Sequence, residues 1–254
     1  MKVVFVGAGN VATHLATELY RNSFDIIQVY SRTMESASAL ARQINAQPVT
    51  DTASIDNSAD LYVFSLKDSV LEDVISQISP NNGLWIHTAG SISMDIFEKY
   101  ASSYGVLYPF QTFSKGRAID WQKVPVFIEA NQSENLDILR SISEKISAQV
   151  AELSSQDRKY VHLTGVFACN FTNHMYALSK LFLNQANLPF DVSLPLIDET
   201  AAKVHVLSPE DAQTGPAVRY DENVMNKHLD LIEDNDIRQI YKLISENIYK
   251  INNR

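Results

Sequence analysis

The stretch Val3-Val4-Phe5-Val6-Gly7-Ala8-Gly9-Asn10-Val11-Ala12 lies at the start of the chain. The apolar residues before Gly7 are typical of a buried strand, and the residues that follow, through Leu19, repeat apolar side chains at helical spacing. Gly7 allows a tight turn, Gly9 lets phosphates approach the backbone, and Ala12 lets the helix pack close to the strand. The stretch therefore predicts a strand–turn–helix unit that binds a dinucleotide, with the pyrophosphate at the positive N-terminal end of the helix.

The end of the second expected strand indicates which dinucleotide binds. Domains that bind NAD carry an acidic residue about 20 positions beyond the glycines, where it accepts hydrogen bonds from the ribose. Here the strand at 26–31 leads into Ser31-Arg32-Thr33, and no acidic residue stands there. Hydroxyl groups and a guanidinium suit a 2′-phosphate, because arginine binds phosphate through a fork of two N–H groups. We expect NADP rather than NAD; the alternative is that Arg32 is a solvated surface residue.

Further cofactor contacts are expected where neighbouring parallel strands end, because their carboxyl ends meet at one edge of the sheet. Lys67 follows the strand at 61–66 and could reach a phosphate or the substrate. The alternative is an exposed lysine at the start of a helix. The expected cofactor-binding residues are Gly7, Gly9, Asn10, Val11, Ser31, Arg32, Thr33, Leu66, Lys67 and Thr88.

Two strand ends carry candidates for the chemistry. His87 opens the small-residue turn at 87–91, where an imidazole could donate a proton because it titrates near neutral pH. A hydrogen-bonded structural histidine is the alternative. The stretch Tyr108–Phe113 places polar groups among aromatic rings, which suits either a wall of a substrate pocket or packing between domains.

The C-terminal half adds two polar candidates. His162, Val166 and Asn170 recur at four-residue steps and so share one helix face. Polar groups on that face need partners, which either a pocket or hydrogen bonds across a dimer would supply. Arg219 follows a Gly-Pro break in the segment Thr214–Asp221 and suits a carboxylate or phosphate; the alternative is an internal Arg–Asp pair. The predicted catalytic residues are His87, Asn170 and Arg219.

The order of the elements predicts two domains. Expected strands cover 2–7, 26–31, 61–66, 84–88, 104–108, 125–129 and 149–153, and expected helices lie between them at 11–21, 34–44, 69–78, 94–101 and 133–146. This alternation predicts a Rossmann-type, mostly parallel sheet covered by helices, in an NADP-binding domain of residues 1–154. Beyond it the strand-like runs end, and helices are expected at 156–185, 190–206, 209–217, 221–233 and 235–251. Residues 155–254 are therefore expected to form an all-helical domain. The chain as a whole is of the α/β class.

Composition narrows the class of protein. The formal net charge of −9 argues against nucleic-acid binding, which needs clustered lysine and arginine. Cys169 is the only cysteine, so the chain has no intrachain disulfide and no multi-cysteine metal site, and no metal is expected. We find no signal peptide and no apolar run long enough to span a membrane, which favours a cytoplasmic protein without a membrane partner.

The long helix expected at 156–185 is apolar over Val161–Leu183. One small domain does not easily supply enough apolar contacts to bury such a helix. The helix therefore indicates a homodimer formed through the helical domain. A fully buried central helix in a monomer is the alternative.

Together these segments resemble a family of Rossmann-like NADP oxidoreductases with a C-terminal helical domain of unknown function. The resemblance covers nearly the whole chain and rests on Gly7–Ala12, Ser31–Thr33, His87–Gly90, Tyr108–Phe113, Val166–Asn170 and Thr214–Asp221. The layout is more distantly similar to pyrroline-5-carboxylate reductase, ketopantoate reductase and the 6-phosphogluconate and β-hydroxyacid dehydrogenases. That similarity implies a 6-phosphogluconate-dehydrogenase-like helical domain that dimerises and closes over the nicotinamide.

One position departs from the distant relatives. The β-hydroxyacid dehydrogenases carry a catalytic lysine four residues before an asparagine on the first long helix. If Asn170 matches that asparagine, Val166 stands in place of the lysine. Ordinary hydroxyacid dehydrogenation is therefore not expected.

We expect an NADP-dependent oxidoreductase that reduces a C=O or C=N bond in a small anionic metabolite. Hydride transfer belongs to the cofactor, and the protein must orient it and supply a proton. The alternatives are a non-catalytic protein that binds or senses NADP and a deazaflavin-linked reductase.

Overall fold

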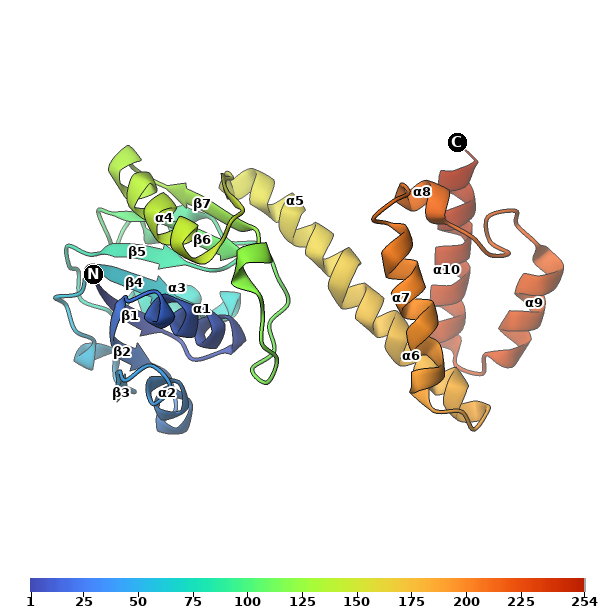
Figure 1. The fold of residues 1–254 in the computed structure, drawn as a ribbon, viewed down its shortest axis with the longest axis horizontal. Coiled ribbons are helices and arrows are strands. Elements are labelled where there is room, and N and C mark those ends of the chain that lie inside the picture. Colours follow the sequence, from blue (N-terminus) through green and yellow to red (C-terminus); the bar gives the residue numbers. More distant parts are fainter. Residues whose placement is uncertain (254) are drawn as a thin grey trace. The chain divides into compact units, whose positions relative to one another are not determined.

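The computed structural model describes residues 1–253, which form two compact units, one spanning Met1–Asn173 and the other beginning at His174. Within the first unit the chain alternates between strands and helices around one sheet (Figure 1). Its strands are β1 (Lys2–Val6), β2 (Asp25–Tyr30), β3 (Gln47–Val49), β4 (Leu61–Phe64), β5 (Leu84–His87), β6 (Tyr104–Pro109), β7 (Val126–Ala130) and β8 (Val150–Glu152). Its α-helices are α1 (Asn10–Arg21), α2 (Met34–Ala41), α3 (Asp68–Ile75), α4 (Ser133–Ile146) and α5 (Ser155–Gly165), with 3₁₀ turns η1 (Thr52–Ser54), η2 (Met94–Phe97) and η3 (Trp121–Lys123).

The sheet has the strand order β3-β2-β1-β4-β5-β6-β7-β8. Neighbouring strands run parallel except β6 and β7, which are antiparallel. The direction in which the chain adds strands reverses at β1, since β2 and β3 lie on one side of it and the later strands on the other. Ligands of open parallel sheets bind beyond the carboxyl ends of the strands at such a reversal, which here is the end of β1.

Both faces of β1 are covered, which explains why its sequence is apolar from Val3 to Val6. Val3 and Phe5 belong to a core cluster completed by α1, α2 and α4, whereas Val4 and Val6 belong to a second cluster completed by α3 and Phe97. Val3, Val4, Phe5 and Val6 are all fully buried, whereas Lys2 at the start of β1 is exposed. A strand covered on both faces reads as a continuous apolar run, and this cover holds the following glycine turn in place.

The predicted strands are all present, and the structure adds β3, which the sequence analysis missed. This short strand pairs only with β2 and contains Pro48, a residue that sheets accept at their edges. The helix expected at 94–101 is only the 3₁₀ turn η2, because buried Phe97 anchors the segment and β6 begins soon afterwards at Tyr104.

The described part of the second unit is helical. Most of α6 (Thr172–Gln185) lies in it, followed by η5 (Phe190–Ser193), α7 (Leu194–Lys203), α8 (Pro209–Ala212), α9 (Glu222–Leu231) and α10 (Asn235–Asn252). The helix expected at 209–217 stops at Ala212, because Gly215 adopts φ +105° and Pro216 lacks a backbone N–H group. Residues of α6, α9, α10 and the segment 214–217 line an apolar cavity of about 410 Å³.

The helix expected at 156–185 is present but changes its geometry within its length. α5 passes into a π-helical segment, η4 (Val166–Phe171), which passes into α6. Phe167 is 61% exposed and Leu163 is 49% exposed in the single chain, and both the dimer and the buried central helix stay predictions. Within residues 1–253, none of the helices has the length and apolar character needed to span a bilayer.

Candidate cofactor and substrate site

The glycine turn after β1 is held against the end of β4. Gly7 has φ +124°, and a β-carbon at Gly7 would lie 2.2 Å from the carbonyl oxygen of Ser65. Only glycine fits that position. A β-carbon at Gly9, by contrast, would meet no atom within 4 Å, so the backbone there borders open space.

The N-terminus of α1 is available to a ligand. Gly9 is its N-cap, no side chain caps the helix, and no acidic residue lies in its first turn. The first N–H groups of a helix then lack partners and carry the positive end of its dipole, which suits a phosphate group. The open space beside Gly9 and this free helix end fit a pyrophosphate.

A cavity of about 500 Å³ surrounds this helix end and collects most of the predicted cofactor residues. Arg32 and Lys67 both line it, and so does Lys115, which the sequence analysis did not single out. Three cationic side chains around a free helix N-terminus make a strongly anion-binding cavity. The other predicted residues that line it are Gly7, Gly9, Asn10, Ser31 and Leu66.

The remaining predicted cofactor residues have other positions. The Thr33 hydroxyl accepts a hydrogen bond from the Ser36 N–H at 3.4 Å and caps α2. Thr88 donates to the Ser65 hydroxyl at 3.1 Å and joins the ends of β4 and β5. Val11 lines a neighbouring pocket rather than the cationic cavity.

The loop that follows β6 is fixed to α1. The Asn10 side-chain amide donates to the Phe113 carbonyl at 2.9 Å, and the imidazole Nε2 of His14 lies 2.9 Å from the Ser114 carbonyl oxygen. These contacts join residues about 100 positions apart in sequence. They bring Lys115 to the nucleotide cavity, which the order of motifs along the chain could not reveal.

Two further cavities adjoin this loop. An aromatic pocket of about 430 Å³ is lined by Asn10, which also lines the cationic cavity, and by Tyr108, Phe110, Phe113 and His162. The Tyr108–Phe113 stretch therefore forms part of a pocket wall, while its role as the wall of a substrate pocket stays a prediction.

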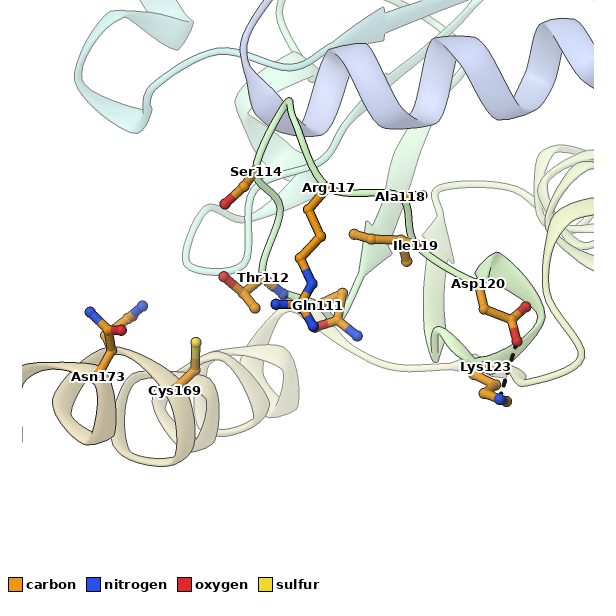
Figure 2. A pocket seen from close by; sticks show the side chains of 11 residues that line it. Gln111, Thr112, Ser114, Arg117, Ala118, Ile119, Asp120, Lys123, Cys169 and Asn173 are labelled. Atoms are coloured by element: carbon orange, nitrogen blue, oxygen red, sulfur yellow. Dashed lines mark hydrogen bonds and ion pairs between the residues drawn. The ribbon is translucent and has the colours of Figure 1, made fainter. Parts of the chain in front are cut away.

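A more polar cavity of about 740 Å³ shares Gln111, Thr112, Cys169 and Asn170 with the aromatic pocket. Figure 2 shows Arg117 reaching from the loop toward Gln111 and Thr112, with the helix that carries Cys169 and Asn173 on the opposite side. The loop side of this cavity therefore offers the guanidinium of Arg117 beside amide and hydroxyl groups, with the Asp120–Lys123 ion pair also in the lining.

The π-helical segment supplies the helix side of both cavities. Cys169 and Asn170 lie within η4 (Val166–Phe171) and line both of them. A π-bulge widens the helix by one residue and is frequent at functional sites. The predicted catalytic residue Asn170 is thus at a cavity wall, while its role stays a prediction.

His87 lies inside the core rather than at a cavity wall. It is fully buried, its Nε2 lies 3.3 Å from the Ser93 carbonyl oxygen, and its Nδ1 accepts the Ala89 N–H at 3.2 Å. Burial lowers the pKa of His87 to about 3, assisted by the positive charge of Arg158, so the ring is neutral at neutral pH. This geometry favours the structural alternative for His87.

Arg219 belongs to the second unit, where its guanidinium lies 3.8 Å from the Asp221 carboxylate. Its side chain is 69% exposed, and Asp221 also caps α9 by accepting the Val224 N–H. The Arg–Asp pair that the sequence left as an alternative is present. Substrate anchoring by Arg219 stays a prediction.

Comparisons with known proteins agree with this geometry. Residues 2–88 match the family model described as NADP oxidoreductase coenzyme F420-dependent, and residues 124–248 match a domain of unknown function, DUF2520. A solved structure from Bacteroides fragilis, described as a "putative NADP oxidoreductase", is 49% identical, with a TM-score of 0.92 over 98% of each chain. The chain belongs to this NADP oxidoreductase family. The resemblance drawn from the sequence is confirmed.

More distant structures share the fold of this NADP oxidoreductase. An imine reductase from Myxococcus stipitatus, solved in complex with NADP⁺, has a TM-score of 0.66 at 12% identity over 100% of this chain and 93% of its own. A pyrroline-5-carboxylate reductase from Coxiella burnetii has a TM-score of 0.57 at 16% identity over 99% and 97%. A comparison with curated proteins finds no significant match.

Proposed function

We propose that this protein is an NADPH-dependent reductase acting on a C=N or C=O bond of a small anionic metabolite. The observation that carries the proposal is the cavity at the N-terminus of α1, which combines the glycine turn with Arg32, Lys67 and Lys115. Membership of an NADP oxidoreductase family supports it.

The residues present fit the cofactor. The N–H groups at the start of α1 would hold the pyrophosphate beside Gly9, and Arg32 would bind the 2′-phosphate beside Ser31. Among the described residues no carboxylate pairs with Arg32, which leaves its guanidinium for a ligand. When bound, the reduced nicotinamide supplies the hydride.

The polar cavity supports an anionic substrate. Arg117 lines it together with Gln111 and Thr112, and no ion pair of Arg117 is present in residues 1–253. A guanidinium beside amide and hydroxyl donors binds a carboxylate through several hydrogen bonds. The imine reductase and the pyrroline-5-carboxylate reductase among the solved structures favour a C=N bond.

Titration of NADPH fluorescence tests the cofactor. Wild type should bind NADPH more tightly than NADH. Arg32→Ala should weaken NADPH binding about 10- to 100-fold, the value of a charge-assisted hydrogen bond, and leave NADH binding nearly unchanged. Arg42→Ala is the matched control, because Arg42 is an exposed arginine just beyond α2 that does not line the cavity. Tighter NADH than NADPH binding by wild type would overturn the NADP assignment.

A screen of 2-oxo acids and cyclic imines with NADPH tests the reaction. Oxidation of NADPH with an anionic member of the panel, and not with its neutral analogue, is the expected result. If wild type binds NADPH and reduces none of them, while NADP changes its oligomeric state, the protein senses NADP instead. Turnover with a reduced deazaflavin and NADP⁺ but not with the panel would favour the deazaflavin-linked reaction that the family model's description names.

We also propose that the protein is a homodimer associated through its helices. Large apolar side chains on α5, η4 and α6 are exposed in the single chain, and burying them would contribute about 25 cal/mol per Å². Light scattering after size-exclusion chromatography should give twice the chain mass of 28.5 kDa. Phe167→Glu should dissociate the dimer, and a monomeric wild type would refute the proposal. The apolar side chains concerned are Leu163, Phe167, Phe171, Leu181 and Phe182.

A further inference from the structure

A tyrosine and a histidine meet at the wall of the aromatic pocket. The Tyr108 hydroxyl oxygen lies 3.1 Å from Nδ1 of His162. Tyr108 belongs to the end of β6 and His162 to α5, so the pair joins residues 54 positions apart. Both side chains line the 430 Å³ pocket, and neither is used by the cofactor site described above.

We propose that Tyr108 and His162 form the proton-donating pair of this site, with Tyr108 as the proton donor to the substrate and His162 as its proton source. The proposal rests on the proposed function, because a reductase must protonate the nitrogen or oxygen of the bond that it reduces.

Two glycines leave room for side chains at and beside the pair. A β-carbon at Gly90 would lie 2.4 Å from His162 Nδ1, so the glycine of the turn after β5 makes room for the imidazole. Phe110 packs in the same way against Gly165, where a β-carbon would lie 3.0 Å from its ring. These two contacts fix α5 against the ends of β5 and β6. Gly90 of the His87–Gly90 motif therefore leaves the space that the His162 imidazole occupies.

The protonation state of Tyr108 suits a donor. Burial raises the pKa of Tyr108 to about 12, against a smaller opposite effect of the Arg158 charge. The hydroxyl therefore keeps its proton at neutral pH. Tyr108 is 9% exposed, so its remaining accessible surface faces the pocket that it lines.

The topology places the pair on the side of the sheet where the reactive half of a dinucleotide is expected. Arg32 follows β2, on one side of β1, whereas Tyr108 ends β6 on the other side. Dinucleotides bind across the point where the strand order reverses, with one nucleotide on each side. With the 2′-phosphate of the adenosine half at Arg32, the nicotinamide half belongs on the side of β4, β5 and β6.

The proton and electron balance is complete with NADPH as reductant. The carbon of the C=N or C=O bond gains a hydride, and its nitrogen or oxygen gains the proton of the Tyr108 hydroxyl. The resulting tyrosinate takes the Nδ1 proton of protonated His162. The exposed His162 then regains a proton from water.

The charged groups around the pair come from three neighbouring elements. Arg158 of α5 bears a positive charge that acts on Tyr108, and it is paired with Glu129 of β7. His87 of β5 is neutral at neutral pH, since burial lowers its pKa to about 3.

The test uses the difference in charge between the two cofactor forms. NADP⁺ carries a positive nicotinamide ring and NADPH a neutral one, so a positive charge at position 162 should weaken NADP⁺ binding selectively. At one fixed pH, His162→Lys should therefore have a ratio of dissociation constants, NADP⁺ over NADPH, about three- to tenfold higher than His162→Gln. This is the effect of one unit charge about 6 Å from another at an effective dielectric constant of about 80 to 40. Titration of the 2′-phosphate cancels in the ratio.

Variants separate the pair from other histidines. Tyr108→Phe, which changes no charge, should leave the wild-type ratio unchanged. His228→Lys against His228→Gln is the matched control and should not change the ratio, because His228 Nδ1 also lies 2.8 Å from a tyrosine hydroxyl, that of Tyr241 in the second unit. On any substrate that wild type reduces, Tyr108→Phe should lower kcat about 10²- to 10⁴-fold at unchanged NADPH affinity.

Each outcome has a distinct meaning. If wild type binds no NADPH, the proposed function fails and the proton-donating pair fails with it. If wild type binds NADPH but His162→Lys raises the ratio no more than His228→Lys does, the pair does not face the nicotinamide and this proposal alone is overturned.

Discussion

The guanidinium of Arg158 and the carboxylate of Glu129 form a buried ion pair, with Nη1 and Oε2 2.7 Å apart and only 1% of the Arg158 side chain exposed. Arg158 Nη2 also donates to the Ile92 carbonyl and, at 3.0 Å, to the Ser155 hydroxyl, which itself donates to Glu129. The pair joins β7, the start of α5 and the segment after β5. It therefore positions the helix that carries His162.

Removing one partner of this pair should be costly. Arg158→Ala leaves the Glu129 carboxylate partly buried without its cation, which typically costs about 3–5 kcal/mol in the free energy of unfolding. The matched control is Arg140→Ala, since Arg140 pairs with Glu152 at a more exposed position and should cost at most about 1 kcal/mol. Urea denaturation of the two variants measures both values. If the two variants lost the same free energy of unfolding, the burial of Arg158 would not determine how much its ion pair stabilises the fold.

The two glycines of the opening turn should respond differently to alanine. Gly7→Ala would force a β-carbon into the Ser65 carbonyl at a positive φ, so it should lower the melting temperature strongly. Gly9→Ala meets no protein atom and should leave the melting temperature within about 2 °C, yet weaken NADPH binding at least tenfold because the methyl group enters the phosphate site. Thermal melting and fluorescence titration distinguish the two effects. Unchanged NADPH affinity in Gly9→Ala would contradict the placement of the pyrophosphate.

Gly90→Ala should disturb the Tyr108–His162 contact. Its β-carbon would overlap the imidazole, and such overpacking typically costs about 1–3 kcal/mol. Gly116→Ala is the control, because a β-carbon there meets nothing within 4 Å and should change the free energy of unfolding by less than about 0.5 kcal/mol. Chemical denaturation gives both numbers. If Gly90→Ala left the free energy of unfolding unchanged, His162 would be able to move aside without an energetic cost.

Buried His87 should make the fold sensitive to acid. Burial lowers the pKa of His87 to about 3, so between about pH 6.5 and pH 3 the unfolded chain binds a proton that the folded chain does not. The free energy of unfolding should therefore fall by up to about 1.4 kcal/mol per pH unit as the pH decreases below 6.5, with no contribution from His87 above that pH.

His87→Gln removes this titration and should flatten the acid side of the stability curve, whatever its effect on stability at neutral pH. The matched control is His228→Gln, which removes an exposed imidazole of the second unit. Urea denaturation at pH 5, 6, 7 and 8 provides the slopes. Parallel curves for wild type and His87→Gln would refute the neutral, buried state of His87.

Local sequence was sufficient to predict most of the strands of the sheet and the glycine turn of the cofactor site. The apolar runs that became β1 and β4 are continuous because both their faces are covered, and this pattern is visible without a structure. Arg32 and Lys67 could be assigned to one cavity because the carboxyl ends of parallel strands meet at one edge. The weak edge strand β3 and the π-helical segment η4 gave no comparable signal, since one is three residues long and the other retains a helical pattern.

The substrate side of the site could not be assigned in the same way. His87 was predicted to be catalytic and His162 only to need a partner on its helix face, yet His87 is buried in the core and His162 lines a pocket. Burial depends on which elements pack against a residue, and those elements are distant in sequence. Lys115 entered the cofactor cavity for a similar reason, because Asn10 and His14 bind the loop that carries it.

The sequence by itself determined the Rossmann-type sheet, the glycine turn and the cationic residue at the end of β2, because each depends on spacing within a few neighbouring residues. Only the tertiary structure decided that His87 is buried in the core, that Tyr108 meets His162 and that Lys115 joins the nucleotide cavity. The physical reason is that these outcomes depend on contacts between strand ends, a long loop and a helix. Such contacts are set by the packing of the whole unit rather than by any local pattern.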